Sequence, residues 1–307
     1  MSAREPLVVS LPSPSWVRAV GPLEGADLVV WDGAGAPPDP APALVVPPYV
    51  ATPDLGGVAG CGAVEAVQLM TIGFDGVPQQ LPPPRVALCN AAGVHEASTA
   101  ELAVGLVIAR LRGVDDDVRA MADGRWGPSR RTALADRRVL VVGFGGVGRA
   151  VAARLAPFEA AVTAVASRAR VQDGVTVHAP EDLPALLPEH DVVVLACPLT
   201  ESTRGLVDAG FLAAMPDGAL LVNVARGPVV DTAALLAQVR TGRLRAALDV
   251  TDPEPLPADH ELWRTPGVLV TPHVGGNTSA FRPRMVRLVR EQVRRRLAGR
   301  EWLNVVR

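Results

Sequence analysis

Three short polar segments follow apolar runs in the second half of the chain. They read Asn-Val-Ala-Arg-Gly at 223–227, Asp-Val-Thr-Asp-Pro-Glu at 249–254 and Thr-Pro-His at 271–273. Any one of them alone is typical of a surface loop. Together they provide a guanidinium, a carboxylate and an imidazole, groups that can bind an anionic substrate, keep a proton donor charged and deliver a proton near neutral pH.

Reduction of a 2-oxo acid by hydride transfer makes use of all three groups. Arg226 is suited to bind the substrate carboxylate and polarise the carbonyl, and His273 is suited to donate the proton. Glu254 beside the imidazole would favour its charged form and fix its orientation. We therefore expect Arg226, Glu254 and His273 to form one catalytic set, with Arg226 and His273 also binding the substrate.

The source of the hydride is predicted by a glycine-rich turn. The apolar run 139–142 leads directly into Gly143-Phe-Gly-Gly-Val-Gly148, and apolar residues then recur at helical spacing. In a dinucleotide-binding turn, the first glycine allows the sharp turn, the second lets the backbone approach a pyrophosphate and the third lets the helix pack on the strand. The helix N-terminus then faces the phosphates with free N–H groups. A second glycine-rich stretch, 57–62, lacks a preceding strand-like run.

Strand candidates alternate with helical segments or loops after this turn. The candidates are 162–166, 191–196, 219–224, 245–250 and 268–271. This alternation predicts a doubly wound parallel sheet, in which ligands bind at the carboxyl ends of the strands. The three polar segments follow the last three candidates, so we expect them at the edge of the sheet that holds the dinucleotide.

Residues 1 to about 95 predict a second, smaller α/β domain, because short apolar runs alternate with turns such as the proline-rich 36–42. Ser98 to Glu101 has the pattern of a capping box and predicts the start of a long helix through Arg110. From about Thr278 the chain is predicted to be helical, and residues 302–306 could form a returning strand.

Composition argues against several classes of function. The chain has 307 residues, of which 49% are hydrophobic and 20% charged, and a net charge of −2. It can form two globular domains but offers no broad basic face for nucleic acid. The arginines of 287–300 are interleaved with apolar residues at helical spacing, which favours a solvated amphipathic helix over a nucleic-acid arm. No apolar run reaches membrane-spanning length.

The cysteines and the N-terminus predict a cytoplasmic protein. Cys61, Cys89 and Cys197 match no disulfide or metal framework, and the first residues lack the pattern of a signal peptide. No metal site is predicted, because no HExxH, paired CxxC or acidic cluster with ligand spacing occurs. All 30 basic residues are arginine, which excludes Schiff-base chemistry on a lysine.

Four motifs, taken in order, resemble the D-isomer-specific 2-hydroxyacid dehydrogenases. They are GFGGVG at 143–148, NVARGPVVD at 223–231, ALDVTDPEPLP at 247–257 and TPHVGG at 271–276. The resemblance covers nearly the whole chain and favours the branch of glyoxylate and hydroxypyruvate reductases. It implies a Rossmann-type dinucleotide-binding domain, 97–279, inserted in a smaller flavodoxin-like α/β substrate-binding domain made of 1–96 and 280–307. It also implies a homodimer paired in part through the helix near Ser98.

The resemblance implies roles for individual residues. The family's catalytic arginine, glutamate and histidine correspond to the three named above, and Asp249 would contact the nicotinamide carboxamide. The substrate carboxylate would bind backbone N–H groups of the loop at Ile72, Gly73 and Phe74. The residues expected to contact the cofactor are Gly143, Gly145, Gly146, Val147, Gly148, Ser167, Arg168, Cys197, Pro198, Thr203, Val224, Ala225, Asp249 and His273.

The residues at the end of the strand candidate 162–166 help to predict which nicotinamide cofactor binds. An NAD site carries an acid there for the ribose hydroxyls, whereas an NADP site lacks the acid and has an arginine. Aligning Phe158 with the family's phenylalanine puts Ala166 at the acid's position, followed by Ser167 and Arg168. We expect NADP as the preferred cofactor; NAD stays open as the alternative, in which Arg168 is a solvent-facing loop residue.

The predicted reaction is reduction of a small 2-oxo acid such as glyoxylate or hydroxypyruvate by NADPH. Two alternatives stay open. One is an NAD-linked member of the family, similar to a phosphoglycerate dehydrogenase. The other is a non-catalytic binding protein that senses dinucleotides, although the presence of all three catalytic residue types argues against it.

The remaining histidines and Cys197 are given minor roles. His95 lies in a hinge-like segment and could approach a ligand, whereas His178, His190 and His260 are predicted surface residues. Nothing in the sequence surrounds Cys197 with activating charge, so we expect it to pack beside the cofactor and not to act as a nucleophile.

Overall fold

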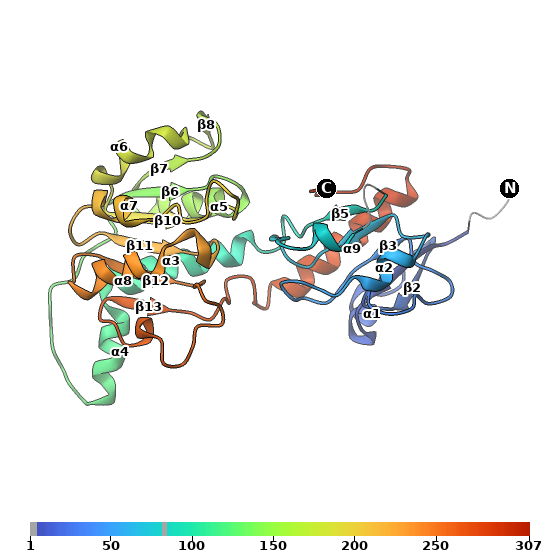
Figure 1. The fold of residues 1–307 in the computed structure, drawn as a ribbon, viewed down its shortest axis with the longest axis horizontal. Coiled ribbons are helices and arrows are strands. Elements are labelled where there is room, and N and C mark those ends of the chain that lie inside the picture. Colours follow the sequence, from blue (N-terminus) through green and yellow to red (C-terminus); the bar gives the residue numbers. More distant parts are fainter. Residues whose placement is uncertain (1–4, 82–84) are drawn as a thin grey trace. The chain divides into compact units, whose positions relative to one another are not determined.

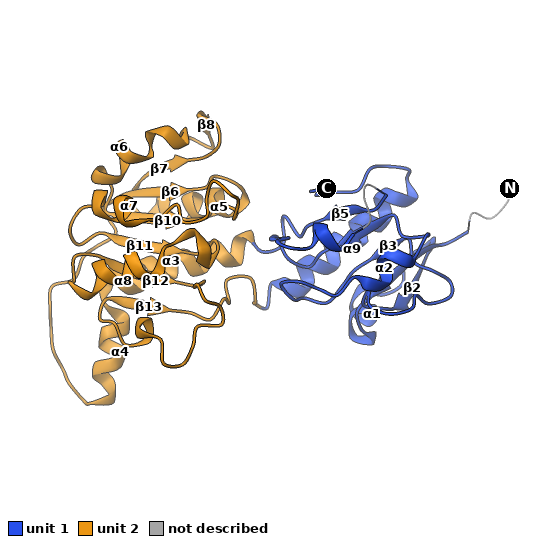
Figure 2. Ribbon diagram, in the orientation of Figure 1, with its two compact units in different colours: residues 1–95, 279–307 blue, residues 96–278 orange. Residues whose placement is uncertain are grey.

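The computed structural model describes residues 5–81 and 85–307, and the chain forms two compact units (Figures 1 and 2). Unit 1 comprises residues 1–95 and 279–307, and unit 2 comprises residues 96–278. Each unit combines helices with a largely parallel sheet, which confirms the predicted α/β class. Over the described ranges, no helix has both the length and the apolar character needed to cross a membrane.

Unit 1 is built on five parallel strands in the order β2-β1-β3-β4-β5, which is the flavodoxin-like order. The strands are β1 Leu7–Leu11, β2 Ala26–Val30, β3 Leu44–Val45, β4 Ala66–Gln68 and β5 Ala87–Cys89; the helices are α1 Pro14–Val20, α2 Gly56–Gly60 and α9 Phe281–Leu297. Helix α9 buries Phe281, Met285, Val289 and Val293 in one core with the strands. Their four-residue spacing places these side chains on one face of the helix.

The C-terminal segment runs back along β5. Val306 donates its N–H to the Leu88 carbonyl at 2.8 Å, and Val305 forms an isolated antiparallel bridge with Cys89. The predicted returning strand is therefore reduced to a bridge at the edge of the sheet.

Unit 2 contains eight strands in the order β13-β12-β11-β10-β6-β7-β9-β8. They are β6 Arg138–Val142, β7 Ala161–Val165, β8 Arg170–Gln172, β9 Val175–His178, β10 Val192–Leu195, β11 Leu220–Asn223, β12 Arg245–Leu248 and β13 Val268–Val270. All neighbours are parallel except β8 and β9. The strand order reverses between β6 and β10, the position at which doubly wound sheets bind ligands.

Helices cover both faces of this sheet (Figure 1). Those that pack on the strands are α3 Glu96–Arg112, α5 Gly146–Leu155, α6 Leu183–Leu186, α7 Ala209–Ala214 and α8 Thr232–Arg240, whereas α4 Val114–Ala122 follows α3 and buries none of its residues. In β6, Val139 and Val141 pack with α3 and α5, whereas Leu140 and Val142 pack with α6, α7 and α8. Strands covered on both faces read as continuous apolar runs, which is why the sequence predicted them well.

The long helix begins earlier than predicted. It begins at Glu96, so Ser98 and Glu101 lie inside it and the predicted capping box is wrong. The Ser98 hydroxyl is instead hydrogen-bonded to the Thr278 hydroxyl, 2.9 Å away. At the other end, Gly113 adopts a left-handed conformation with φ of +64° and separates α3 from α4.

The antiparallel hairpin of β8 and β9 was not predicted. Its strands have only three and four residues, and polar side chains interrupt their apolar pattern. The turn is Asp173-Gly174, and both residues have positive φ, +54° and +77°. Asp-Gly with two positive φ values is the signature of a tight hairpin turn, so this dipeptide was the signal that could have revealed the hairpin.

The prediction that His190 lies on the surface is wrong. Its side chain is buried, with 3% exposure, and Nδ1 donates to the Leu186 carbonyl at 2.7 Å. His178 and His260 are partly exposed, and His260 Nδ1 accepts the Leu262 N–H.

Two glycines of the turn before α5 should respond differently to alanine. A Cβ on Gly148 would lie 1.9 Å from the Gly143 carbonyl oxygen, whereas a Cβ on Gly145 would meet nothing within 4 Å. Overpacking against backbone costs about 1–3 kcal/mol. We expect Gly148→Ala to lower the thermal unfolding midpoint without cofactor by several degrees and Gly145→Ala to leave it nearly unchanged; equal midpoints would contradict the close approach.

Candidate active site

Three adjacent strands of unit 2 end at one level of the sheet. Asn223, the last residue of β11, is in register with Leu248, the last residue of β12, and Leu248 is in register with Val270, the last residue of β13. The segments that follow therefore leave the sheet at the same edge. These segments carry the three predicted catalytic residues.

His273 and Glu254 form a direct pair at this edge. His273 Nδ1 lies 2.5 Å from Glu254 Oε1, and the two side chains are 45% and 40% exposed. A carboxylate that accepts the Nδ1 proton leaves Nε2 as the ring nitrogen available to a ligand. The pair therefore has the geometry of an oriented proton donor that a solvent-accessible ligand can reach.

The loop that carries His273 is held by Asp249, whose side chain is buried with 3% exposure. Asp249 Oδ1 accepts the Thr271 hydroxyl at 2.6 Å and the Val274 N–H at 3.0 Å, and Oδ2 accepts the Gly275 N–H at 2.9 Å. The Asp249 backbone carbonyl accepts the His273 N–H. His273 has a φ of +51°, which is unfavourable for a residue with a Cβ, so these contacts stabilise a strained conformation.

Arg226 sits in a turn that Asn223 organises from the end of β11. The Asn223 side chain accepts the Ala225 N–H and donates to the Arg226 carbonyl, both at 3.0 Å. The next residue, Gly227, lies so close to the neighbouring segment that a Cβ would be 1.8 Å from the Thr251 carbonyl oxygen. The turn that carries Arg226 and the segment that leads to Glu254 are thus packed backbone to backbone.

The glycine-rich turn has the shape that a dinucleotide needs. Gly143 has a φ of +99°, and a Cβ there would lie 2.4 Å from the Cys197 nitrogen. Gly145 is the N-cap of α5 and has no side chain to occupy the N–H groups of Gly146, Val147 and Gly148. These residues fit a pyrophosphate, because an uncapped helix N-terminus offers several N–H donors and a positive dipole end.

The segment after β10 borders this turn. Cys197 is 8% exposed, and burial raises the pKa of its thiol to about 11. The thiol is therefore protonated at neutral pH and is a poor nucleophile. The Thr203 hydroxyl donates to the Pro198 carbonyl at 2.7 Å, which closes the loop between them.

Val224 and Ala225, which follow β11, were also expected to contact the cofactor. Both side chains are buried, with 8% and 6% exposure. They line the start of the turn that carries Arg226, so any contact they make with a ligand is limited to a small part of each residue.

The end of β7 presents a cation. Ser167 and Arg168 are exposed, and the Arg168 guanidinium makes no hydrogen bond or ion pair with the described residues. Arg170, which the sequence analysis did not single out, donates to the carbonyls of Arg168 and Phe144 at 2.9 Å and 3.2 Å. The carbonyl of Phe144 belongs to the glycine-rich turn.

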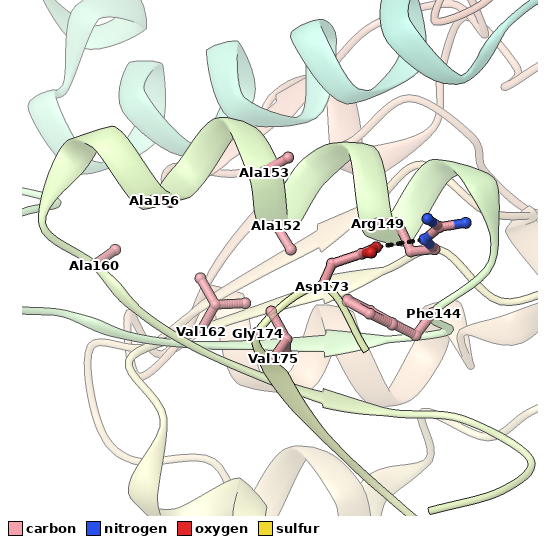
Figure 3. Close-up of a pocket in the computed structure, with 10 residues that line it drawn as sticks. All are labelled: Phe144, Arg149, Ala152, Ala153, Ala156, Ala160, Val162, Asp173, Gly174 and Val175. Carbon is pink, nitrogen blue, oxygen red and sulfur yellow. Dashed lines mark hydrogen bonds and ion pairs between the residues drawn. The ribbon is translucent and has the colours of Figure 1, made fainter. Parts of the chain in front are cut away.

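A cavity of about 260 Å³ lies beside this region, between α5 and the β8–β9 hairpin (Figure 3). It is lined by Phe144, Arg149, Ala152, Ala153, Ala156, Ala160, Val162, Asp173, Gly174 and Val175. None of the predicted catalytic residues lines it. Its lining is mostly small apolar side chains, with Arg149 and Asp173 as the charged exceptions.

In unit 1, the loop after β4 has the features of an anion site. Asn90 donates to the Ile72 carbonyl at 2.9 Å, and the Thr71 hydroxyl donates to the Gly73 carbonyl at 2.7 Å. Within the described residues, the backbone N–H groups of Ile72, Gly73 and Phe74 make no hydrogen bond. They are therefore open to a carboxylate.

His95 is buried and in contact with other side chains of unit 1. It is buried, with 5% exposure, its Nε2 lies 2.7 Å from the Met70 carbonyl oxygen, and its ring stacks on Tyr49 and Phe281. The described residues contain no group of three or more His, Cys, Asp or Glu side chains placed to hold a metal ion.

The family model for the D-isomer specific 2-hydroxyacid dehydrogenase, NAD binding domain, matches residues 104–275, which is more than half of the chain. The chain belongs to this family. The protein is therefore an NAD(P)-dependent oxidoreductase, and the residues that match the NAD-binding model all lie in unit 2.

Individual relatives agree with the family. A hydroxypyruvate reductase of Thermotoga maritima is 34% identical over 70% of this chain and 71% of its own length. A D-3-phosphoglycerate dehydrogenase of Mycobacterium leprae is 35% identical over 81% of this chain and 48% of its own. The crystal structure of a D-isomer specific 2-hydroxyacid dehydrogenase from Xanthobacter autotrophicus Py2 in complex with NADPH and MES has a TM-score of 0.82 at 31% identity, covering 99% and 98% of the two chains.

Asp249→Asn tests the anchoring of the histidine loop in the dehydrogenase. The substitution removes the charge that accepts three hydrogen bonds, and a hydrogen bond to a charged group contributes about 1.5–3 kcal/mol. We expect a lower unfolding midpoint without cofactor and a lower kcat. Asp252→Asn is the control, because Asp252 is exposed and its side chain makes no hydrogen bond within the described residues. Equal stability of the two variants would contradict the anchoring role.

Proposed function

We propose that the enzyme reduces a small 2-oxo acid, of the glyoxylate or hydroxypyruvate kind, to the D-2-hydroxy acid with NADPH. The observation that carries the proposal is the pair of His273 and Glu254 at the sheet edge beside the dinucleotide turn. The name of the Thermotoga maritima relative, a hydroxypyruvate reductase, supports this substrate class. In this proposal unit 2 is the dinucleotide-binding domain and unit 1 the substrate-binding domain.

The roles of the catalytic residues follow from their contacts. NADPH, when bound, would supply the hydride that the carbonyl carbon of the substrate accepts. His273 gives its Nε2 proton to the carbonyl oxygen, while Glu254 holds Nδ1 and stabilises the charged ring before the transfer. Arg226 binds the substrate carboxylate and polarises the carbonyl. Asp249 contacts the nicotinamide carboxamide through the carboxylate lone pairs that its three hydrogen bonds to the histidine loop do not use.

The preference for NADP rests on the end of β7. Ala166 stands where an NAD enzyme carries an acid. Ser167 and Arg168 follow it, and the Arg168 guanidinium has no partner within residues 5–81 and 85–307. An exposed cation without an acid beside it suits a 2′-phosphate and gives no specific contact to the ribose hydroxyls of NAD. NADPH in the Xanthobacter autotrophicus structure agrees with this proposal.

An activity like that of phosphoglycerate dehydrogenase is the second candidate function, because the D-3-phosphoglycerate dehydrogenase of Mycobacterium leprae is 35% identical over most of this chain. A phosphorylated substrate needs an additional cationic contact. The loops at 48–57 and 72–77, which face the substrate in the proposed assignment, contain no arginine or lysine. This favours a substrate with a small, uncharged side group.

Initial rates of NADPH and NADH oxidation test the function, with glyoxylate, hydroxypyruvate, pyruvate and 3-phosphohydroxypyruvate as substrates. We expect NADPH to dominate, and Arg168→Ala to raise KM for NADPH about tenfold or more while KM for NADH changes little, because a lost charged contact costs about 1.5–3 kcal/mol. Equal effects on both cofactors would contradict the phosphate contact. His273→Ala is the catalytic control: it should bind NADPH normally and turn over far more slowly.

We further propose a homodimer in which a second copy covers the exposed face of α4. Val114, Val118 and Met121 recur at helical spacing and are 47%, 58% and 75% exposed, and Trp126 in the following loop is 96% exposed. Neighbouring apolar side chains of this kind mark an interaction surface.

The free, buried cysteines agree with a reducing cytoplasmic location, which we also propose.

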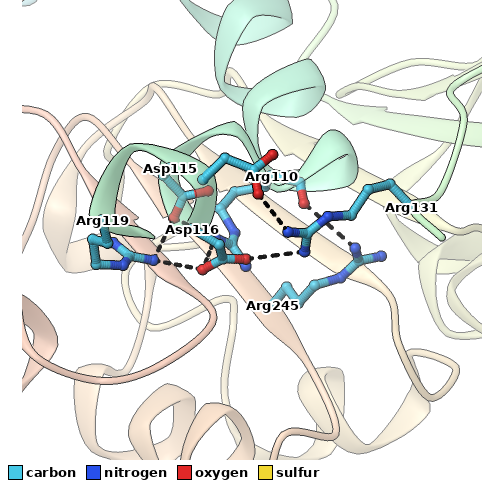
Figure 4. A network of polar contacts seen from close by, with 7 residues as sticks. Arg110, Asp115, Asp116, Arg119, Arg131 and Arg245 are labelled. Atoms are coloured by element: carbon cyan, nitrogen blue, oxygen red, sulfur yellow. Dashed lines mark hydrogen bonds and ion pairs between the residues drawn. The ribbon is translucent and has the colours of Figure 1, made fainter. Parts of the chain in front are cut away.

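The opposite side of α4 is tied to its own unit by ion pairs (Figure 4). Asp115 and Asp116 bind Arg110, Arg119 and Arg131, and Arg110 is only 4% exposed. A helix held firmly by its polar side and open on its apolar side is suited to dock on a partner. We expect light scattering to give the mass of two chains, and Met121→Ser with Trp126→Ser to shift it towards one; a monomeric parent protein would contradict the proposal.

A further inference from the structure

The turn that carries Arg168 is held by a second arginine. We propose that Arg170 is a positioning residue for the cofactor: it fixes the turn of residues 166–169 against the glycine-rich turn, so that Arg168 and Ser167 are preformed for a 2′-phosphate. The inference rests on the proposed function, because the 2′-phosphate is that of the NADPH proposed there.

The contacts of Arg170 span three parts of unit 2. Its Nε donates to Gln172 Oε1 at 2.7 Å, its Nη1 donates to the Arg168 carbonyl at 2.9 Å, and its Nη2 donates to the Phe144 carbonyl at 3.2 Å. One guanidinium therefore joins β8, the turn after β7 and the glycine-rich turn before α5. The planar fork of arginine can make three such contacts at fixed angles, which the single ammonium of lysine cannot.

A second contact fastens the same hairpin at its tip. Arg149, in the first turns of α5, donates to Asp173 Oδ2 at 2.6 Å, and Asp173 lies in the tight turn between β8 and β9 (Figure 3). The hairpin is thus attached to both the start of α5 and the loop before it. Residues 166–169 connect β7 to this fastened hairpin, so their path is fixed at both ends.

Arg168 and Arg170 have different roles in this proposal. Each of the three guanidinium nitrogens of Arg170 donates to an acceptor of its own chain, whereas the Arg168 guanidinium has no such acceptor among the described residues. Arg168 is the cation available to a ligand. Arg170 acts on the ligand through the backbone that carries Arg168.

Kinetics distinguish positioning from direct contact. We expect Arg170→Ala to raise KM for NADPH about tenfold, with KM for NADH and kcat within about twofold of the parent enzyme. Arg170→Lys should behave like Arg170→Ala, since the charge is kept but the fork is lost. In the Arg168→Ala background, Arg170→Ala should add little. Parent-like behaviour of Arg170→Lys, or additive effects in the double variant, would overturn the proposal and favour a direct phosphate contact.

Amide hydrogen exchange without cofactor tests the anchor independently of the proposed function. We expect Arg170→Ala to speed exchange in residues 166–172 at least tenfold, Gln172→Leu to have a smaller effect in the same direction, and Arg168→Ala to leave exchange unchanged. Unchanged exchange in Arg170→Ala would overturn the anchor. Faster exchange in Arg170→Ala, combined with equal NADPH and NADH effects in Arg168→Ala, would uphold the anchor and refute the phosphate site.

Discussion

Burial of the central sheet on both faces is the constraint on which the rest of unit 2 depends. Strands β6, β10, β11 and β12 pack helices above and below, so their side chains are apolar along almost their whole length. Polar side chains are therefore confined to the segments that follow the strand ends. Because the strands are parallel and in register, the ends after β11, β12 and β13 meet at one edge. The segments that carry the arginine, the carboxylate and the imidazole therefore leave the sheet at the same edge.

Positioning at that edge depends on buried polar side chains whose hydrogen bonds go to backbone. Asp249 holds the loop of His273, and Asn223 holds the turn of Arg226. Both side chains are nearly inaccessible to solvent, so an unmet hydrogen bond at either position would be costly. Such residues fix the orientation of the groups that face the ligand, which surface contacts in water would do only weakly.

The segments after β6 and β7, where we propose that the cofactor binds, are also held in place by contacts within unit 2. There, close backbone contacts at Gly143 and Gly148 shape the turn, and the β8–β9 hairpin supports the loop beyond β7. A short hairpin of this kind has little core of its own. It is held by Arg149 and Arg170, whose bonds reach into α5 and the glycine-rich turn.

The sequence by itself determined the α/β class, the family and most strands of unit 2, because fully covered parallel strands leave uninterrupted apolar runs and because glycines are needed where backbones meet. Elements whose structure depends on distant partners were predicted poorly. The start of α3 was set too late, since the Ser98 hydroxyl bonds Thr278 and does not cap the helix, and His190 was assigned to the surface although a helix carbonyl satisfies its ring.

Only the tertiary structure decided which polar side chains are bonded within the protein and which stay exposed. Asp249 was expected only to contact the nicotinamide, whereas in the structure its carboxylate also accepts three hydrogen bonds from the loop of His273. Arg168 and Arg170 are two residues apart and chemically identical, and only the fold of the hairpin gives one of them three internal acceptors and the other none among the described residues. The sequence lists donors and acceptors, whereas their pairing is fixed by distances that arise when the chain packs.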